Sequence, residues 1–446
     1  MITKMLKLTP LLLLLFAWRS SIAQAPGQTQ TQTPTPPPVA GTSAPTAPIS
    51  LDQCYQLAER NYPLTKQRAL IEKTKEYTIA NISKGVYPQF LVNGSATYQS
   101  DVTKISLPQS TNITIPSVSK DQYKLYGEVS QTLTDFGINK QRRTISQTDA
   151  QLQQENLNTQ LYQLKDRINQ LFFGILLIDE QLEQNDLAAK DIQTGINNVQ
   201  ATILNGTGFT SSLNKLKAEL LKTNQQAIDL HSTRKAYTDM LSLFIDQPIT
   251  DTTKLTKPIP PALTTSITRP ELKAYDLQIQ SYTQQLRLTK LNLNPQLNAF
   301  FQGGMGKPNP VNFLSTNLNG YYITGIRLTW TIGSWYTYKK DQLISKNNQE
   351  MIKAQKNTFL FNTQLTLNQQ KEDITRYQQL IASDDEIVYL RETVSKTSGV
   401  QLQNGVITAN DYLLDINAAS QARQDRAVHE IQLLLSQYNH QTTAGY

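Results

Sequence analysis

Cysteine and histidine are scarce in this chain of 446 residues, and their scarcity excludes several kinds of site. Cys54 is the only cysteine, so the chain forms neither an intramolecular disulfide nor a cluster of thiolate ligands. The three histidines, His231, His429 and His440, are widely spaced, and none belongs to an HExxH motif. The glycines at 303–306 are not followed by the Lys and Ser or Thr of a phosphate-binding loop. We therefore predict a protein that is not an enzyme, with no metal, no cofactor and no catalytic residue.

Charged residues are also few. They make up 17% of the chain, which is low for a solvent-exposed coiled coil, and Gln, Asn, Thr and Ser fill the polar positions instead. The formal net charge is +7, and the removal of Lys4, Lys7 and Arg19 with a signal peptide would leave +4. This charge is too small to indicate binding to nucleic acid.

Long apolar runs are absent after the N-terminus, so we predict no transmembrane helix. Residues 1–23 have the features of a secretory signal: two lysines, the apolar run Leu11–Trp18, and a Ser21-Ile22-Ala23 cleavage site. Residues 24–49 are rich in Pro, Thr and Gln and predict a disordered leader. The folded part begins near Ser50, a residue type that caps helices.

Proline is missing from residues 139–245, where a long heptad pattern runs. Steps of alternately four and three residues from Leu157 reach apolar residues at every position but Asn185: Leu161, Leu164, Ile168, Leu171, Ile175, Ile178, Leu182, Asn185, Ala189, Ile192, Ile196, Val199 and Ile203. The pattern predicts one helix from about Asn139 to Leu204, roughly 100 Å long at ~1.5 Å per residue.

The same pattern resumes after the turn Asn205-Gly206-Thr207-Gly208. It passes through Leu213, Leu216, Leu220, Thr223, Ala227, Leu230, Arg234, Tyr237, Leu241 and Phe244. Gly206 and Gly208 can supply the positive φ that ends one helix and starts the next. We predict an antiparallel helical hairpin whose second arm is about half as long as the first.

The whole arrangement occurs twice. Residues 50–245 form a first repeat of helix, two strands, long helix and helix, and residues 269–440 form a second one. A Pro- and Thr-rich connector, residues 246–268, joins the repeats, and residues 441–446 form a short tail.

Four segments alternate between apolar and polar residues, which predicts strands at about 87–100, 122–134, 295–305 and 320–332. Alternation over about ten residues with aromatics near the ends is typical of transmembrane β-barrels. Amphipathic strands of a soluble sandwich are the general alternative, but no second sheet is predicted that would cover the apolar face. Four strands cannot close a barrel, and an open edge is not tolerated in lipid, so we expect several chains to share one barrel.

Several motifs in this order are similar to those of the TolC-type outer-membrane efflux family. They are Leu57-Ala58 with Asn61 and Pro63, Arg269-Pro270-Glu271-Leu272, the prolines before each first strand, Leu133-Thr134-Asp135-Phe136-Gly137, and Gln403-Asn404-Gly405-Val406-Ile407-Thr408 followed by Asp411, Leu413 and Ala418. The resemblance covers nearly all of residues 50–440.

The resemblance implies an α+β membrane protein and a homotrimer in the outer membrane, in which four strands per chain build one twelve-stranded barrel. Its long helical hairpins would form a periplasmic tunnel. The family conducts drugs, other small molecules or polypeptides outward from an inner-membrane pump through a periplasmic adaptor. The loops 101–121 and 306–319 would face the exterior.

The resemblance also implies sites. The turns that would contact the adaptor contain Asn205, Gly206, Gly208, Phe209, Asn404, Gly405, Val406 and Ile407. The family often has a pair of aspartates that line the periplasmic aperture; Asp411 stands at the first of these positions, whereas Leu414 occupies the second and Asp415 follows it. Asp411 and Asp415 share a helix face and would line the aperture together; the alternative is that both are ordinary acids near a helix start. The aromatics expected at the lipid interface are Tyr98, Tyr123, Tyr321, Tyr322, Trp330 and Trp335.

A second function class is open, namely a secreted or peripheral coiled-coil scaffold without channel activity. The strands favour the duct, but nothing in the sequence distinguishes drugs, metals and polypeptides as cargo. In the second hairpin the apolar pattern of Leu380, Ile387, Leu390 and Val394 is interrupted near the turn. We therefore expect the first hairpin to be the rigid wall and the second to be the gate.

Overall fold

The computed structural model describes residues 48–103, 117–250, 253–312, 315 and 317–446. The predicted signal peptide and all but the last two residues of the predicted leader lie outside the described residues. Most of the predicted loop 101–121 and part of the predicted loop 306–319 do so as well.

The first repeat contains the predicted elements with small changes at their ends. They are α1 (Leu51–Asn61), a 3-10 turn (Pro63–Thr65), α2 (Lys66–Lys84), β1 (Gln89–Tyr98), β2 (Asp121–Thr132), α3 (Ile138–Tyr162), α4 (Leu164–Leu204) and α5 (Thr210–Ile245). Ser50 caps α1, because its hydroxyl accepts from the Gln53 N–H while the Gln53 side chain accepts from the Ser50 N–H. The single helix predicted over 139–204 is interrupted at Gln163, although the Gln163 N–H still donates to the Thr159 carbonyl at 3.2 Å.

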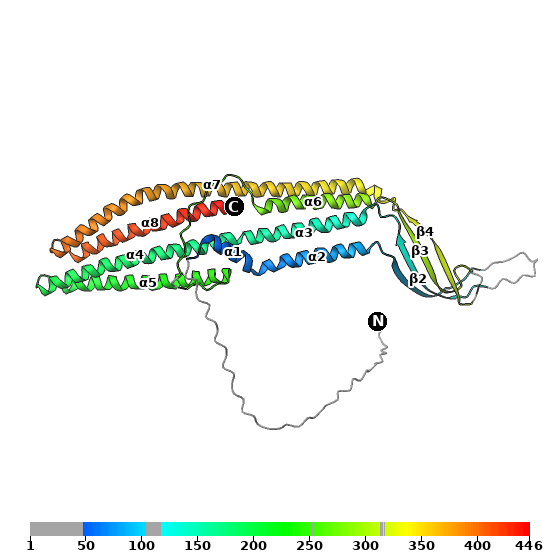
Figure 1. Cartoon of the computed structure of the whole chain (residues 1–446), viewed down its shortest axis with the longest axis horizontal. Helices are drawn as coiled ribbons and strands as arrows, with labels where there is room; N and C mark the ends of the chain where they lie inside the picture. The colour runs from blue at the N-terminus through cyan, green and yellow to red at the C-terminus, as the bar shows by residue number, and fades with distance from the viewer. Residues whose placement is uncertain (1–47, 104–116, 251–252, 313–314, 316) are drawn as a thin grey trace, which may run out of the picture. The chain divides into compact units, whose positions relative to one another are not determined.

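The second repeat contains α6 (Pro270–Leu291), β3 (Gln296–Lys307), β4 (Asn319–Thr329), α7 (Ser334–Gln403) and α8 (Ala409–Ala444). Pro270 stands at the first position of α6, where its missing N–H costs no helical hydrogen bond. The helix α8 continues through residues 441–444, which we had expected in the tail. Figure 1 shows α7 as one unbroken helix, whereas its counterpart in the first repeat is divided into α3 and α4.

The four strands form one antiparallel sheet in the order β1-β2-β3-β4. Residues paired across neighbouring strands point to the same face, so the register assigns every side chain to a side. One face carries Phe90, Val92, Tyr98, Tyr123, Leu125, Val129, Leu297, Phe301, Met305, Tyr322, Ile326 and Leu328. The other carries mostly polar residues, including Asn93, Ser95, Gln122, Lys124, Glu128, Gln302 and Arg327. The predicted alternation is confirmed over all four strands.

The helices pair as two hairpins that also contact each other. α4 packs on α5, α7 packs on α8, and α8 packs on α4, while α3 lies between α2 and α6. In Figure 1 the turns of both hairpins lie at one end of the helices, and the strands follow the other end of α2, α3, α6 and α7. Among the described residues no helix is long and apolar enough to span a membrane.

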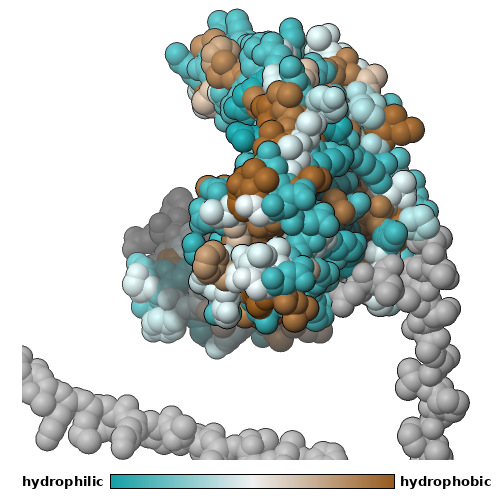
Figure 2. Space-filling model, turned by 90° about the vertical axis from the view of Figure 1, so that its left-hand side faces the viewer, coloured by the Kyte–Doolittle hydropathy of each residue, from teal (hydrophilic) through white to brown (hydrophobic). Residues whose placement is uncertain are grey.

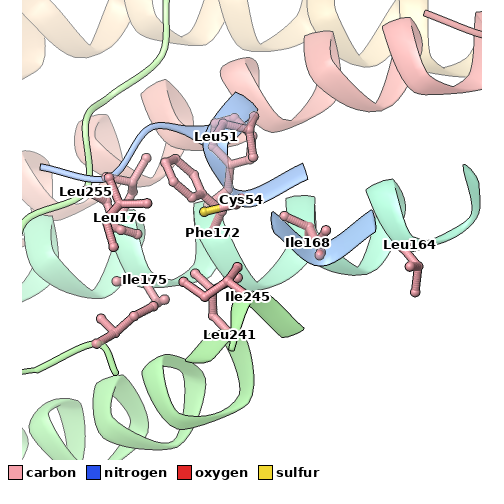
Figure 3. Packing of buried hydrophobic residues seen from close by; sticks show 14 of the residues in the cluster. Leu51, Cys54, Leu164, Ile168, Phe172, Ile175, Leu176, Leu241, Ile245 and Leu255 are labelled. Atoms are coloured by element: carbon pink, nitrogen blue, oxygen red, sulfur yellow. The ribbon is translucent and has the colours of Figure 1, made fainter. Parts of the chain in front are cut away.

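The main hydrophobic core lies where α1, α4, α5 and α8 meet (Figure 3). Phe172, Ile175, Leu241 and Ile245 are fully buried there, together with Cys54. Burying such a side chain contributes about 1.5–3 kcal/mol each, which makes this core a major source of stability. A second, smaller core near the turns contains Ile192, Ile196, Val199, Leu216, Leu402, Tyr412 and Ile416.

The heptad pattern of the first hairpin is confirmed, because its apolar positions are buried or half-buried along α3 and α4. The polar positions in it have partners. The Asn185 amide donates to the Gln226 side chain at 3.4 Å. The buried Arg234 pairs with Asp179 at 2.6 Å and donates to the Thr253 carbonyl of the connector at 3.2 Å. These pairs avoid the free-energy cost of burying an amide without a hydrogen-bond partner or a charge without a counter-charge.

The apolar pattern predicted for the second hairpin is found only in part, since Leu380 is half-buried but the other three residues are exposed. Ile387, Leu390 and Val394 are 46%, 54% and 43% exposed. On α7, the polar residues Asp384 and Ser398 are buried, and they contact His429 and Asp415 of α8. The pair of His429 with Asp384, at 2.6 Å, crosses the interface. Polar pairs of this kind therefore supplement the apolar cluster that Leu402 forms with Tyr412 and Ile416 in the second hairpin.

Candidate functional site

The apolar face of the sheet is exposed, and the polar face is partly buried along β2 and β3, the reverse of an amphipathic strand in water. On the apolar face Phe90, Val92 and Ile326 are 78%, 74% and 68% exposed. On the polar face Lys124, Tyr126, Glu128 and Gln302 are half-buried or buried. Antiparallel sheets in water normally bury their apolar side. The arrangement suits a sheet that is solvated by lipid on one side and by water on the other.

The predicted interface aromatics lie at two levels of the sheet. Tyr98, Tyr123 and Tyr322 project from the apolar face in the half of the sheet that is away from the helices, where Tyr322 stacks on Phe301 with ring centroids 6.3 Å apart. Trp330 and Trp335 lie at the helical end, where the Trp330 indole donates to the Leu293 carbonyl at 3.0 Å. Both tryptophans are half exposed.

Tyr321 differs from the other five. Its register partner is Gly304, which places it on the polar face, and its side chain is buried. The hydroxyl of Tyr321 accepts from the Gln302 amide at 3.5 Å. The sequence did not separate Tyr321 from its neighbour Tyr322, because only the register assigns each of them to a face.

The turn between α4 and α5 is a compact cap. Gly206 adopts φ +78°, the left-handed conformation that favours glycine. The Thr207 and Gly208 N–H groups both donate to the Thr202 carbonyl, at 2.9 and 3.0 Å. Gly208 does not need positive φ, contrary to our expectation; a Cβ there would lie only 2.5 Å from the Thr202 hydroxyl. Close packing explains the second glycine.

The turn between α7 and α8 is built in the same way. Gly405 adopts φ +70°, and the Val406 N–H donates to the Gln401 carbonyl at 2.8 Å, closing the end of α7. The Asn404 side chain donates to the Val400 carbonyl at 2.8 Å. Ile407 turns inward onto the smaller core, whereas Val406 stays exposed. Both turns are therefore rigid loops with apolar residues at their surface.

Asp411 closes a capping box at the start of α8. Its carboxylate accepts from the Thr408 N–H at 3.1 Å and from the Thr408 hydroxyl at 2.7 Å, while its own N–H donates to that hydroxyl. The hydrogen bonds from Thr408 hold the pKa of the Asp411 carboxyl below its usual range. Asp415 is directed elsewhere and accepts a hydrogen bond from the buried Ser398 of α7. Although they are one turn apart, the two carboxylates have different partners.

A cluster that we did not anticipate joins the two hairpins above the turns. The Tyr412 hydroxyl of α8 donates to the Asp191 carbonyl of α4 at 2.9 Å. Arg423, whose side chain is only 15% exposed, bridges Asp191 on α4 at 3.3 Å and Glu392 on α7 at 3.5 Å. Burial, and then the negative charge of Asp191, raise the pKa of Tyr412 to about 12, so it remains a neutral donor.

Gly195 makes this cluster possible. A Cβ at Gly195 would lie 2.4 Å from the Tyr412 ring, so only glycine lets the ring lie against α4. A glycine in the middle of a helix was the one signal in the sequence, since it weakens the helix unless something packs closely against it.

Two long helical hairpins connected to a four-stranded sheet with an apolar outer face define the fold of the TolC-type outer-membrane channels. No family model matches the sequence, and no curated protein sequence matches it significantly. Solved structures do match, and they confirm at the level of the fold the resemblance that the motifs indicate.

The fold is similar to that of the outer membrane protein VceC from Vibrio cholerae, with a TM-score of 0.63 and 12% identity over 89% of this chain and 96% of that one. The Campylobacter jejuni CmeC outer membrane channel gives a TM-score of 0.62 and 11% identity over 89% and 85% of the two chains. The open-state Neisseria gonorrhoeae MtrE outer membrane channel gives 0.63 and 13% over 89% of each chain.

Proposed function

We propose that the chain is the outer-membrane exit duct of a tripartite export system. It conducts solutes passively from an inner-membrane pump, through a periplasmic adaptor, to the exterior. The sheet carries this proposal, because four strands with exposed apolar side chains on one face and mostly polar side chains on the other are stable with lipid on the first face and a water-filled lumen on the second.

The edges of the sheet support assembly as a homotrimer. Within the part of the chain that the structure describes, β1 and β4 each pair with one strand, and unpaired strand edges are not tolerated in lipid. Three chains joined from β4 to β1 complete a twelve-stranded barrel without an edge. The exposed stripe of Ile387, Leu390 and Val394 on α7 then packs on the neighbouring chain, since a coiled coil does not leave such a stripe in water.

The two turns are the proposed contacts with the adaptor. Leu204, Phe209 and Val406 are 88%, 75% and 70% exposed there. Figure 2 looks onto this end of the molecule, where brown hydrophobic patches lie among teal hydrophilic residues. Exposed apolar side chains on rigid turns suit docking of another helical protein, because little entropy is lost on binding.

Asp411 is the better placed of the two aspartates to line the periplasmic entrance, since its residue is exposed while Asp415 is engaged with Ser398. Three Asp411 carboxylates around a narrow axis attract cations. Block of the trimer conductance by a polyvalent cation from the periplasmic side should be lost in Asp411→Ala. Undiminished block in that variant would contradict the aperture role.

The test of the duct is fractionation followed by electrical recording. We expect heat-sensitive trimers in the outer-membrane fraction and ion conductance of the purified chain in planar bilayers. The alternative, a secreted or peripheral scaffold, requires extraction by carbonate or salt and no conductance. The cargo, whether drugs, other small molecules, metals or polypeptides, is chosen by the pump and adaptor, which crosslinking and co-purification would identify.

A further inference from the structure

The polar face of the sheet carries three charged residues among those that the structure describes, and two of them neutralise each other. Arg327 pairs with Glu128 at 3.2 Å, and its guanidinium lies 4.5 Å from the centre of the Phe300 ring. Lys124 is the third, and within the described ranges it has no carboxylate partner. Each chain therefore presents one uncompensated positive charge on this face.

Lys124 is held by aromatic rings instead of an acid. Its ammonium lies 4.5 Å from the centre of the Tyr126 ring and 6.0 Å from that of Tyr321. Gly304 lies between these tyrosines in the register, and Gly306 is opposite Lys124, so no side chain of β3 stands between the rings and the ammonium. Two tyrosines of β2 and β4 and two glycines of β3 thus surround the charge, and Pro308 and Pro310 of the loop after β3 lie against Gly306.

The hydroxyls of Tyr126 and Tyr321 are further hydrogen-bond donors beside the ammonium. The Tyr321 hydroxyl accepts from the Gln302 amide at 3.5 Å, and among the described residues no protein acceptor takes its own proton. In the part of the chain that the structure describes, no protein acceptor takes the proton of the Tyr126 hydroxyl either. An ammonium beside two phenolic donors, without a carboxylate partner among the described residues, is a site for an anion.

We infer that Lys124, with Tyr126 and Tyr321, forms an anion-binding ring in the lumen of the shared barrel, near its outer mouth. This rests on the proposed function, since the ring requires three chains around one axis. Lys124 lies three residues from the Asp121 end of β2, in the half of the sheet away from the helices. Three ammonium groups around a pore favour entry of anions. Anionic solutes are therefore the class of cargo that this section of the duct favours.

The test uses two inert probes of the same geometry and opposite charge, hexacyanocobaltate(III) and hexaamminecobalt(III), on trimers of the full chain in planar bilayers at low salt. The anion added on the outer side should block the wild-type conductance, and the cation added there should not. In Lys124→Gln the anion block should weaken at least about tenfold, because the central charge is lost. Lys124→Arg should retain it.

Lys307→Gln is the matched control. Lys307 lies at the same level of the sheet but on the apolar face, where it pairs with Asp121 at 2.8 Å, so this variant should keep the anion block. Normal conductance with no anion block in the wild type, or equal block in Lys124→Gln, would overturn the anion ring alone. Absence of any conductance from well-folded trimers would refute the duct itself, and the ring with it.

Discussion

Arg423 on α8 lies 3.3 Å from the Asp191 carboxylate on α4, and this ion pair joins the two helical hairpins directly. Its guanidinium also reaches Glu392 on α7, so one mostly buried side chain connects three helices. Nearby, Tyr412 donates to the Asp191 carbonyl. These polar contacts lie beside the smaller apolar core that the two hairpins share near their turns, so polar and apolar contacts together join the second hairpin to the first.

These contacts should hold the proposed entrance closed. Arg423→Ala removes both ion pairs and leaves the Asp191 and Glu392 carboxylates without the cation between them, so the second hairpin should move away from α4. We expect a larger single-channel conductance than that of the wild type in planar bilayers. Arg426→Ala is the control, because Arg426 pairs with Asp385 and Glu430 within the second hairpin. An equal increase in conductance in both variants would show that the contact of Arg423 with α4 does not hold the entrance closed.

Crosslinking should have the opposite effect. Cysteines in place of Asp191 and Arg423, joined by a short bismaleimide, should tie the hairpins together and lower transport, and reduction of a cleavable version should restore it. Unchanged transport after complete crosslinking would refute the second hairpin as the gate.

Two glycines beside the same tyrosine allow a steric test. Gly195→Ala places a methyl group 2.4 Å from the Tyr412 ring, whereas Gly399→Ala places one at 3.8 Å, an ordinary contact. Overpacking of this kind typically costs about 1–3 kcal/mol. Gly195→Ala should therefore lower the thermal midpoint measured by circular dichroism, and Gly399→Ala should leave it unchanged or raise it slightly through helix propensity. Equal midpoints for the two variants would contradict the close packing of Tyr412 on α4.

The thiol of Cys54 should be inert in the native protein. Cys54 is fully buried in the main core, and burial raises its pKa to about 12, so almost no thiolate exists at neutral pH. Ellman's reagent should detect no thiol in native trimers at pH 8 and one thiol per chain in denaturant. Rapid labelling without unfolding would mean that this core opens.

Stability at acid pH should depend on Asp411. Its folded pKa is depressed by the Thr408 hydrogen bonds below the ordinary 3.8. The carboxylate therefore contributes stability above that ordinary pKa, and the contribution is lost as the pH falls through the folded value. Thermal midpoints recorded between pH 7 and pH 2.5 should fall less in Asp411→Asn than in the wild type. A steeper loss in the variant would show that Asp411 is stabilised in its protonated form, as in a crowded ring of acids.

Local sequence patterns were sufficient to predict the helices, strands and turns of the protein. The heptad positions from Leu157 to Ile203 are buried because a helix of that period has only one apolar side, which must find a partner. Alternation in the strands likewise specified two unlike faces. Pro63 interrupts the first helix because it cannot donate a hydrogen bond, and Gly206 and Gly405 close the turns because they adopt positive φ.

Contacts between segments far apart in the chain could not be predicted from the sequence. The face to which Tyr321 points depends on strand register, since a shift of one residue exchanges the two sides of a sheet. The spacing of Ile387, Leu390 and Val394 predicts an internal apolar seam, but in the structure these residues are exposed. The polar residues Asp384 and Ser398 contact α8. The joining of Asp191 to Tyr412 and Arg423, and of Lys124 to two tyrosines, likewise depends on packing across more than one element. The sequence by itself determined which elements form and which side of each is apolar, whereas only the tertiary structure decided which polar side chains meet between them.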